Sequence, residues 1–247
     1  MGIISSRSQA DSPGTTVAPD AAPKGGTPAS PEANNSSSKD KKEPQAKREI
    51  HNFNEIVGWD QNITKDQACT DTGVLLGGTT KIKRFWVDKR KTNCFMLFPR
   101  GLSITWGDNS SYWTWPPQDE IDGAGGGAGI EMAELKNVCW LEIRSELELS
   151  HLTPRVTYEV IFEVMVRARS YGWHVKVDLR LKFPDGRIQE RKESLEEKPR
   201  DEWLLLKVGD VETHKGQNGV LVISLSEYGS HWKKGLVVKG IMITPKE

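Results

Sequence analysis

Residues 156–168 read Val-Thr-Tyr-Glu-Val-Ile-Phe-Glu-Val-Met-Val-Arg-Ala, with an apolar or aromatic residue at every even position and mostly polar residues between them. A period of two is typical of a strand that is buried on one face. Residues 173–183 alternate in the same way and end at Pro184-Asp185-Gly186, which has the composition of a turn. The second half of the chain is therefore predicted to contain two long neighbouring strands.

Shorter alternating segments predict six further strands, at residues 93–98, 102–106, 138–147, 203–208, 220–225 and 236–243. Helical spacing appears only at 130–136, and the charged segment 189–201 is predicted to be a loop. Strands with no helices between them cannot make parallel crossovers. The sequence therefore predicts an all-β fold, an antiparallel two-sheet β-sandwich of the jelly-roll type.

The first 49 residues differ in composition from the rest. They contain no aromatic residue and are rich in Pro, Ser, Ala, Gly and Lys, whereas the remainder holds all 9 Trp, 6 Phe and 4 Tyr. A segment with so little apolar surface cannot offset the entropy lost on folding. We expect a disordered tail at 1–49, a lead-in segment at 50–80 and a single domain at 81–247.

Charge and cysteine content bear on partners and location. Lys plus Arg and Asp plus Glu are both 34, so the net charge favours neither nucleic acid nor acidic membranes. Three cysteines and the lack of a secretory signal predict free thiols and a cytoplasmic or nuclear location, without secretion. Met1-Gly2-Ile3-Ile4-Ser5-Ser6 fits the myristoylation pattern, which predicts acylation of Gly2 and weak membrane association.

Motifs for catalysis or metal binding are missing from the sequence. The five histidines have no metal-ligand spacing, no G-x-S-x-G motif occurs, and the glycine-rich run 123–129 is expected to be a flexible loop. The sequence thus predicts no enzyme, no metal and no cofactor. A basic run at 81–91 interleaves Lys and Arg with Phe and Trp, which fits either weak RNA binding or a solvated basic edge.

The richest stretch for ligand binding is 102–115, which holds three tryptophans in ten residues: Trp106, Trp113 and Trp115. Indole faces suit the apolar faces of pyranose rings, and nearby polar groups can orient sugar hydroxyls. We predict a saccharide site in which Asp108, Asn109 and Tyr112 supply those groups. The alternative is core packing, because Trp106 shares the parity of Ile104.

Several of these segments carry a family resemblance. The residues concerned are 85–89, 93–98, 102–106, 112–115, 133–135, 138–144 and 232–240. In this order they resemble the signature blocks of the phloem protein 2-like lectins of plants, and the resemblance covers most of 81–245. It implies a carbohydrate-binding β-sandwich, found in phloem sap, cytosol or nucleus, that recognises N-acetylglucosamine (GlcNAc) oligomers and N-glycan cores in phloem or defence responses.

The resemblance also implies site residues. Trp106 and Trp113 fall on the family's sugar-binding tryptophans, and Glu227 falls on one of its two implicated glutamates. The second glutamate aligns with Val220, a departure expected to affect sugar preference. Trp113 is expected to contact the sugar, and Trp140 to lie in the core.

The sequence also bears on the partners of the protein and on alternative functions. The predicted ligands are glycans, and a homo-oligomer is expected because one shallow site binds a sugar weakly and linked sites raise avidity. Three other functions stay open at this point: a glycan-cleaving enzyme, an RNA-binding phloem protein, and a protein adaptor with a vestigial sugar site.

Overall fold

The computed structural model describes residues 49–58, 62–123 and 129–247. The predicted tail, including Gly2, and most of the glycine-rich run lie outside the described residues. The elements in chain order are α1 (Phe53–Val57), α2 (Lys65–Ala68), β1 (Val74–Leu76), β2 (Lys83–Val87), β3 (Asn93–Leu97), η1 (Pro99–Gly101), β4 (Ser103–Ile104), β5 (Trp113–Thr114), α3 (Gln118–Asp122), β6 (Ala133–Leu135), β7 (Leu141–Glu148), η2 (Leu149–His151), β8 (Thr157–Tyr171), β9 (Val177–Lys182), β10 (Ile188–Glu193), β11 (Trp203–Glu212), β12 (Val220–Glu227) and β13 (Lys234–Pro245).

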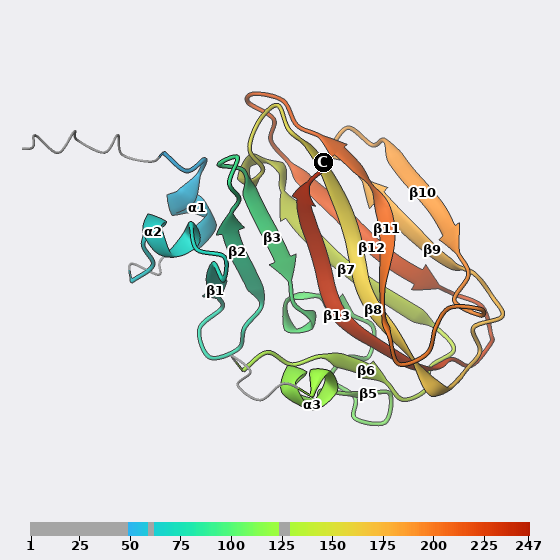
Figure 1. Ribbon diagram of the computed structural model, residues 1–247. Coiled ribbons are helices and arrows are strands. Elements are labelled where there is room, and N and C mark those ends of the chain that lie inside the picture. The colour runs from blue at the N-terminus through green and yellow to red at the C-terminus, as the bar shows by residue number, and fades with distance from the viewer. Residues whose placement is uncertain (1–48, 59–61, 124–128) are drawn as a thin grey trace, which may run out of the picture. The chain divides into compact units, whose positions relative to one another are not determined.

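The strands form two antiparallel sheets packed face to face (Figure 1). One sheet has eight strands: β13 is flanked on one side by β8 and β11, and on the other by β3 and β6, which lead to β2–β1 and to β5 respectively. The second sheet has five strands in the order β10–β9–β12–β7–β4. The predicted all-β, two-sheet sandwich is confirmed.

The core lies between the sheets and follows the alternation seen in the sequence. On β8 the even positions from Tyr158 to Val166 are buried, and on β9 Val177, Leu179 and Leu181 are buried while the residues between them are not. Removing these apolar faces from water is the main term that stabilises such a sandwich.

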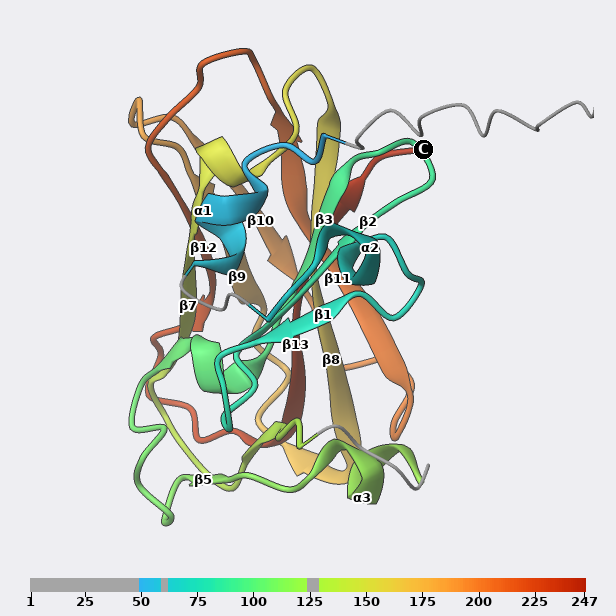
Figure 2. The same ribbon diagram turned by 90° about the vertical axis from the view of Figure 1, so that its left-hand side faces the viewer.

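The lead-in segment 50–80 is part of this core. Phe53 and Ile56 of α1, Ala68 of α2 and Leu76 of β1 are all buried in the main cluster. The ring of Phe53 lies 6.4 Å from that of Phe85 on β2. Figures 1 and 2 show both helices at the edge of the eight-stranded sheet where β1 and β2 lie. The folded domain therefore begins near residue 50 rather than at 81.

Residues 130–136 do not form the predicted helix. They contain β6, which pairs with β13 through Ala133 and Glu134 and with β5 through Leu135. Ala133 and Leu135 are buried and Glu134 is not, which is a strand pattern of only three residues. Two pairing partners outweigh the short helical spacing because each supplies backbone hydrogen bonds.

The segment 189–201 was predicted to be a loop, yet it begins with β10, an edge strand paired to β9. Its charged side chains pair across the two strands: Arg180 contacts Glu190 at 2.9 Å and Lys192 contacts Asp178 at 2.9 Å. Opposite charges facing each other can support a strand that lacks apolar alternation, and charge also protects a free edge from further pairing. The sequence did not predict this strand because the segment has no apolar alternation.

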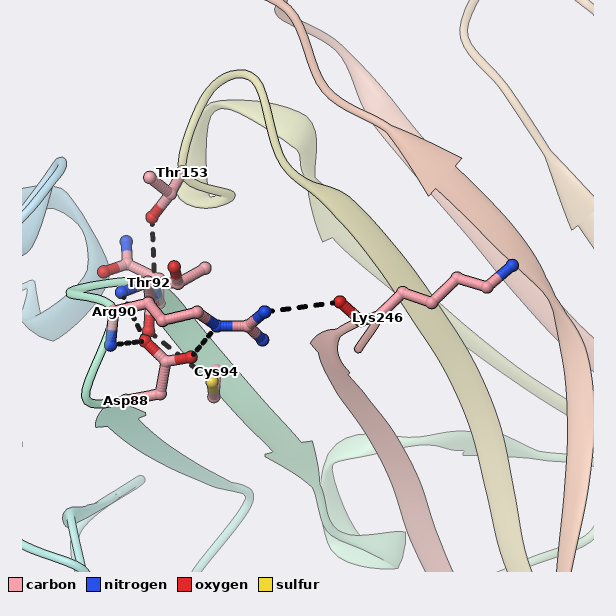
Figure 3. Close-up of polar contacts among 7 residues, drawn as sticks. Asp88, Arg90, Thr92, Cys94, Thr153 and Lys246 are labelled. Carbon is pink, nitrogen blue, oxygen red and sulfur yellow. Dashed lines mark hydrogen bonds and ion pairs between the residues drawn. The ribbon is translucent and has the colours of Figure 1, made fainter.

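The turn between β2 and β3 is tied to the C-terminal residues (Figure 3). Asp88 Oδ1 accepts hydrogen bonds from the main-chain N–H groups of Arg90 and Thr92 at 2.9 and 2.8 Å. The Arg90 side chain donates to the carbonyl oxygen of Lys246 at 3.4 Å. Within the described ranges, no helix is long and apolar enough to cross a membrane.

Candidate functional site

The tryptophan-rich loop joins β4 to β5. Trp106 has a φ of 57°, a left-handed conformation that is uncommon for a residue other than glycine. The residue is 45% exposed. The turn is closed by main-chain bonds from Gly107 to Ile104 at 2.9 Å and from Asn109 to Trp106 at 3.0 Å. Such strain, about 1–3 kcal/mol, persists only where the surroundings hold the backbone firmly.

Two other tryptophans donate hydrogen bonds to the backbone of this loop. The Trp113 indole N–H donates to the Thr105 carbonyl at 3.1 Å, and the Trp115 indole N–H donates to the Gly107 carbonyl at 3.0 Å. Trp113 itself is only 1% exposed. It cannot offer a ring face to a sugar, so the prediction that it contacts the ligand is wrong. Its position on β5, paired with Leu135 of β6, turns the side chain into the core.

Trp115 is fixed in turn by an ion pair. The Arg100 guanidinium lies 3.7 Å from the centre of the Trp115 ring and binds Glu131 through two hydrogen bonds of 2.7 and 3.1 Å. A bidentate pair stacked on an indole is among the more rigid surface arrangements. Nothing local in the sequence marks Arg100, because its partners lie 15 and 31 residues away.

Trp106 and Tyr112 form the exposed part of the loop. Their ring centres are 5.3 Å apart with planes tilted by 39°, and Tyr112 is half-buried. Asp108 and Asn109 are exposed beside them. The Asn109 Oδ1 accepts the main-chain N–H of Ser111 at 2.9 Å, so this side chain also orders the turn. The structure thus brings four of the predicted residues together on one loop.

Glu227 has an internal partner. Its Oε1 accepts the Gly229 main-chain N–H at 2.8 Å, and its Oε2 forms an ion pair with Lys233. Lys233 is fully buried and donates to the carbonyl oxygens of Cys139 and His231, each at 2.6 Å. With only 11% of its side chain exposed, Glu227 chiefly neutralises a buried cation. The expectation that it serves as an open sugar acceptor needs this correction.

Val220 lies far from Glu227. The two residues begin and end β12, which is seven residue steps along an extended strand, or about 24 Å. Val220 pairs with Glu148 at the opposite end of the sheet from Glu227, which pairs with Leu141. A side chain at position 220 therefore cannot share one sugar ring with Glu227.

A second aromatic pair was missed by the sequence analysis. Trp140 and Tyr228 are 45% and 41% exposed, and their ring centres are 4.5 Å apart. The Tyr228 hydroxyl donates to Glu142 Oε1 at 2.8 Å. The expectation that Trp140 lies in the core is wrong. Leu141 faces inward at the start of β7, and strand parity then places residue 140 outside with Glu142.

The pairing register places these groups at one end of the five-stranded sheet. Glu227 pairs with Leu141, and the Thr105 main-chain N–H donates to the Glu142 carbonyl at 3.0 Å. Trp106 follows β4, Trp140 precedes β7 and Tyr228 follows β12. These three residues therefore lie at the same end of the sheet.

A groove of about 760 Å³ lies beside the loop. It is lined by Ser111 and Thr114 and by charged residues of β6, β8 and β13. Arg167 in this groove pairs with Glu134 at 3.2 Å and with Asp201 at 3.9 Å. The described lining residues include no aromatic ring, so the groove lacks a stacking surface.

The basic run at 81–91 is largely engaged within the protein. Its first half forms β2, where the Lys83 ammonium lies 5.8 Å from the Phe95 ring centre and burial lowers the pKa of Lys83. The Arg84 guanidinium lies 4.9 Å from the Trp86 ring centre and donates to the Asp71 carbonyl. Among the described residues, no group of three or more His, Cys, Asp or Glu side chains is placed to hold a metal ion.

Comparison with known proteins gives a matching family and several similar proteins. Residues 92–245 match the family described as Phloem protein 2. Protein PHLOEM PROTEIN 2-LIKE A1 of Arabidopsis thaliana is 42% identical over 179 residues, which cover 71% of each chain. A protein of Luffa acutangula named Lectin is 41% identical over 177 residues, 71% of this chain and 81% of that one. A second protein named Lectin, from Coccinia grandis, is 32% identical over 149 residues, 60% of this chain and 92% of that one.

The matched region holds the strands of both sheets from β3 onward, the tryptophan-rich loop and the Glu227–Lys233 pair. The chain therefore belongs to the phloem protein 2 family.

Proposed function

We propose that this protein is a carbohydrate-binding protein without enzymatic activity and that Trp106 is the centre of its sugar site. The observation that carries the proposal is the exposed indole of Trp106 on a loop whose backbone is held by the indole N–H groups of Trp113 and Trp115. A flat apolar surface on a rigid support can stack against a pyranose ring with little loss of conformational entropy.

Polar groups around Trp106 support the same function. Asp108 offers an exposed carboxylate, Asn109 an exposed side-chain amide and Tyr112 a phenol hydroxyl on the ring next to the indole. A few such groups beside an apolar surface are the usual composition of a small-ligand site, and they can fix the directions of sugar hydroxyls.

The proposed ligands are GlcNAc oligomers and the cores of N-linked glycans. This specificity rests on membership of the family and on two relatives named lectins. The same membership supports a role in phloem, with defence as the proposed context. One open site of this kind corresponds to a dissociation constant of about 1 mM to 1 μM. We also propose self-association, since linked sites raise the apparent affinity.

Titration of the purified protein with chitotriose tests the proposal. The wild-type protein should bind with heat change and fluorescence quenching, and Trp106→Ala should abolish binding while the circular dichroism spectrum stays unchanged. Trp232→Ala is the matched control, because Trp232 is 51% exposed and lies outside the loop. Equal binding by wild type and Trp106→Ala would remove Trp106 from the site.

The absence of enzymatic activity is tested separately. Prolonged incubation with chitin oligomers, followed by mass spectrometry, should return the oligomers intact. Release of shorter products that stops on substitution of an exposed carboxylate would replace binding with hydrolysis as the function.

A further inference from the structure

Trp140 and Tyr228 form one continuous exposed surface from two neighbouring strands. Trp140 immediately precedes β7 and Tyr228 immediately follows β12, and their ring centres are 4.5 Å apart with planes tilted by 40°. Both side chains are more than 40% exposed. Single exposed apolar residues are normal on a protein surface, whereas contiguous apolar patches mark interaction sites. Aromatic residues are also enriched at interfaces, so this pair is a candidate binding surface.

Polar groups surround this pair as they surround Trp106. The Tyr228 hydroxyl donates to Glu142 Oε1 at 2.8 Å, and burial is the main cause that raises the pKa of Tyr228, with Glu142 adding to it. The phenol therefore stays protonated at neutral pH and orients the carboxylate. Arg180 of β9 pairs in register with Ser224 of β12. Its side chain lies on the outer face of the sheet, the face that also carries Glu142. An acceptor and a donor thus flank the two rings.

The pair lies at the same end of the five-stranded sheet as the proposed sugar site. The Thr105 main-chain N–H donates to the Glu142 carbonyl at 3.0 Å, so β4, β7 and β12 run side by side up to this end of the sheet. Strands in a sheet lie about 4.8 Å apart, and the backbones that carry Trp106 and Tyr228 are therefore separated by two spacings, or about 10 Å. That distance is on the scale of a few sugar rings rather than one.

We propose that Trp140 and Tyr228, with Glu142, form a second saccharide subsite beside Trp106, so that the ligand is a linear oligosaccharide of several rings lying across the ends of β4, β7 and β12. This inference rests on the proposed sugar-binding function and specifies its ligand: the interior of an extended neutral chain rather than a single terminal sugar. Neutral rings suit the site because Glu142 and Arg180 already have partners in Tyr228 and Glu190.

The test compares two ligands, GlcNAc and chitotetraose, by isothermal titration and by nuclear magnetic resonance titration. The wild-type protein should bind chitotetraose at least ten times more tightly than GlcNAc. Trp140→Ala should leave GlcNAc binding unchanged and weaken chitotetraose binding at least tenfold. Tyr228→Ala removes the other ring from a different strand and should give the same pattern. Leu205→Ala is the control, because Leu205 is 61% exposed on β11 in the other sheet, and it should change neither affinity.

The outcomes separate this inference from the function on which it rests. Chitotetraose affinity that is unchanged in both Trp140→Ala and Tyr228→Ala overturns the second subsite and leaves the Trp106 site intact. Equal affinity of the wild type for both ligands does the same. If the wild type binds neither ligand, the sugar-binding function itself fails, and the aromatic pair is then left as a surface for a protein partner.

Discussion

The indole N–H of Trp113 and the main-chain carbonyl of Thr105 are joined by a 3.1 Å hydrogen bond, directly before the exposed Trp106. One tryptophan thus supports the backbone from the core while another is presented to solvent. The two tryptophans are only seven positions apart, yet their substitutions should affect different properties. Substitution of Trp113 should lower stability, and substitution of Trp106 should remove sugar binding.

Replacing Trp113 should mainly destabilise the fold. Trp113→Ala leaves a large cavity in the core and should lower the free energy of unfolding by about 3–5 kcal/mol. Trp113→Phe retains most of the volume but leaves the Thr105 carbonyl without its donor, a loss of about 1 kcal/mol beyond the change in packing. Urea denaturation measures both. Trp140→Ala is the control, and as a surface substitution it should stay within about 0.5 kcal/mol of wild type.

The positive φ of Trp106 makes a separate prediction. Glycine adopts this conformation without steric strain, whereas alanine does not. Trp106→Gly should therefore be more stable than Trp106→Ala, by about 1 kcal/mol, and both should lose sugar binding. Thermal and urea unfolding of the two variants side by side would check it, and a less stable glycine variant would show that the backbone there is not strained.

The ion pair between Glu227 and Lys233 should be asymmetric in its energetics. Lys233 is fully buried, so Glu227→Gln leaves an uncompensated charge in the core and should cost about 3–5 kcal/mol. Lys233→Met should be milder, because Glu227 is partly exposed and keeps its bond to the Gly229 N–H. The double variant Glu227→Gln/Lys233→Met should recover stability relative to Glu227→Gln.

Lys234→Met is the matched control for these variants, since Lys234 is the exposed neighbour of Lys233. Its urea midpoint should equal that of wild type. A double variant whose loss equals the sum of the two single losses would mean that the two charges do not interact.

Cys94 should be unreactive in the native protein. Burial, followed by the negative charge of Asp88, raises the pKa of the Cys94 thiol to about 12, so almost no thiolate exists at pH 8. Reaction with a coloured disulfide reagent should modify Cys69 and Cys139 first and Cys94 only after unfolding. Cys94→Ala should leave the rapid phase unchanged, and loss of a rapidly reacting thiol in that variant would contradict the assignment.

His151 should make stability depend on pH. Burial, together with the charges of Lys83 and His51, lowers the pKa of His151, against a smaller opposing effect of Glu55. The unfolded chain then binds more protons than the native state as pH falls through about 6.5, so this contribution to stability is present above that pH and is lost below it. Urea denaturation at pH 7.5 and 5.5 should show a smaller loss for His151→Gln than for wild type. His214→Gln, an exposed control, should lose as much as wild type.

Much of the fold follows from local pattern. The alternation at 156–168 and 173–183 predicted β8 and β9 because side chains on a strand point to opposite faces, a property that needs no knowledge of the partner strand. The prediction failed where pairing decided the structure. At 130–136 two partner strands outweighed a helical spacing, and at β10 charges across the strands replaced the apolar signal.

The candidate site could likewise be predicted only in part from the sequence. The sequence by itself determined that 102–115 is rich in tryptophan, and its motifs gave the resemblance to the family. Only the tertiary structure decided that Trp106 faces solvent while Trp113 is buried, that Glu227 is matched to a buried lysine, and that Trp140 and Tyr228 meet. The physical reason is that burial and ring contacts depend on the register of strands distant in the chain, and no local pattern records that register.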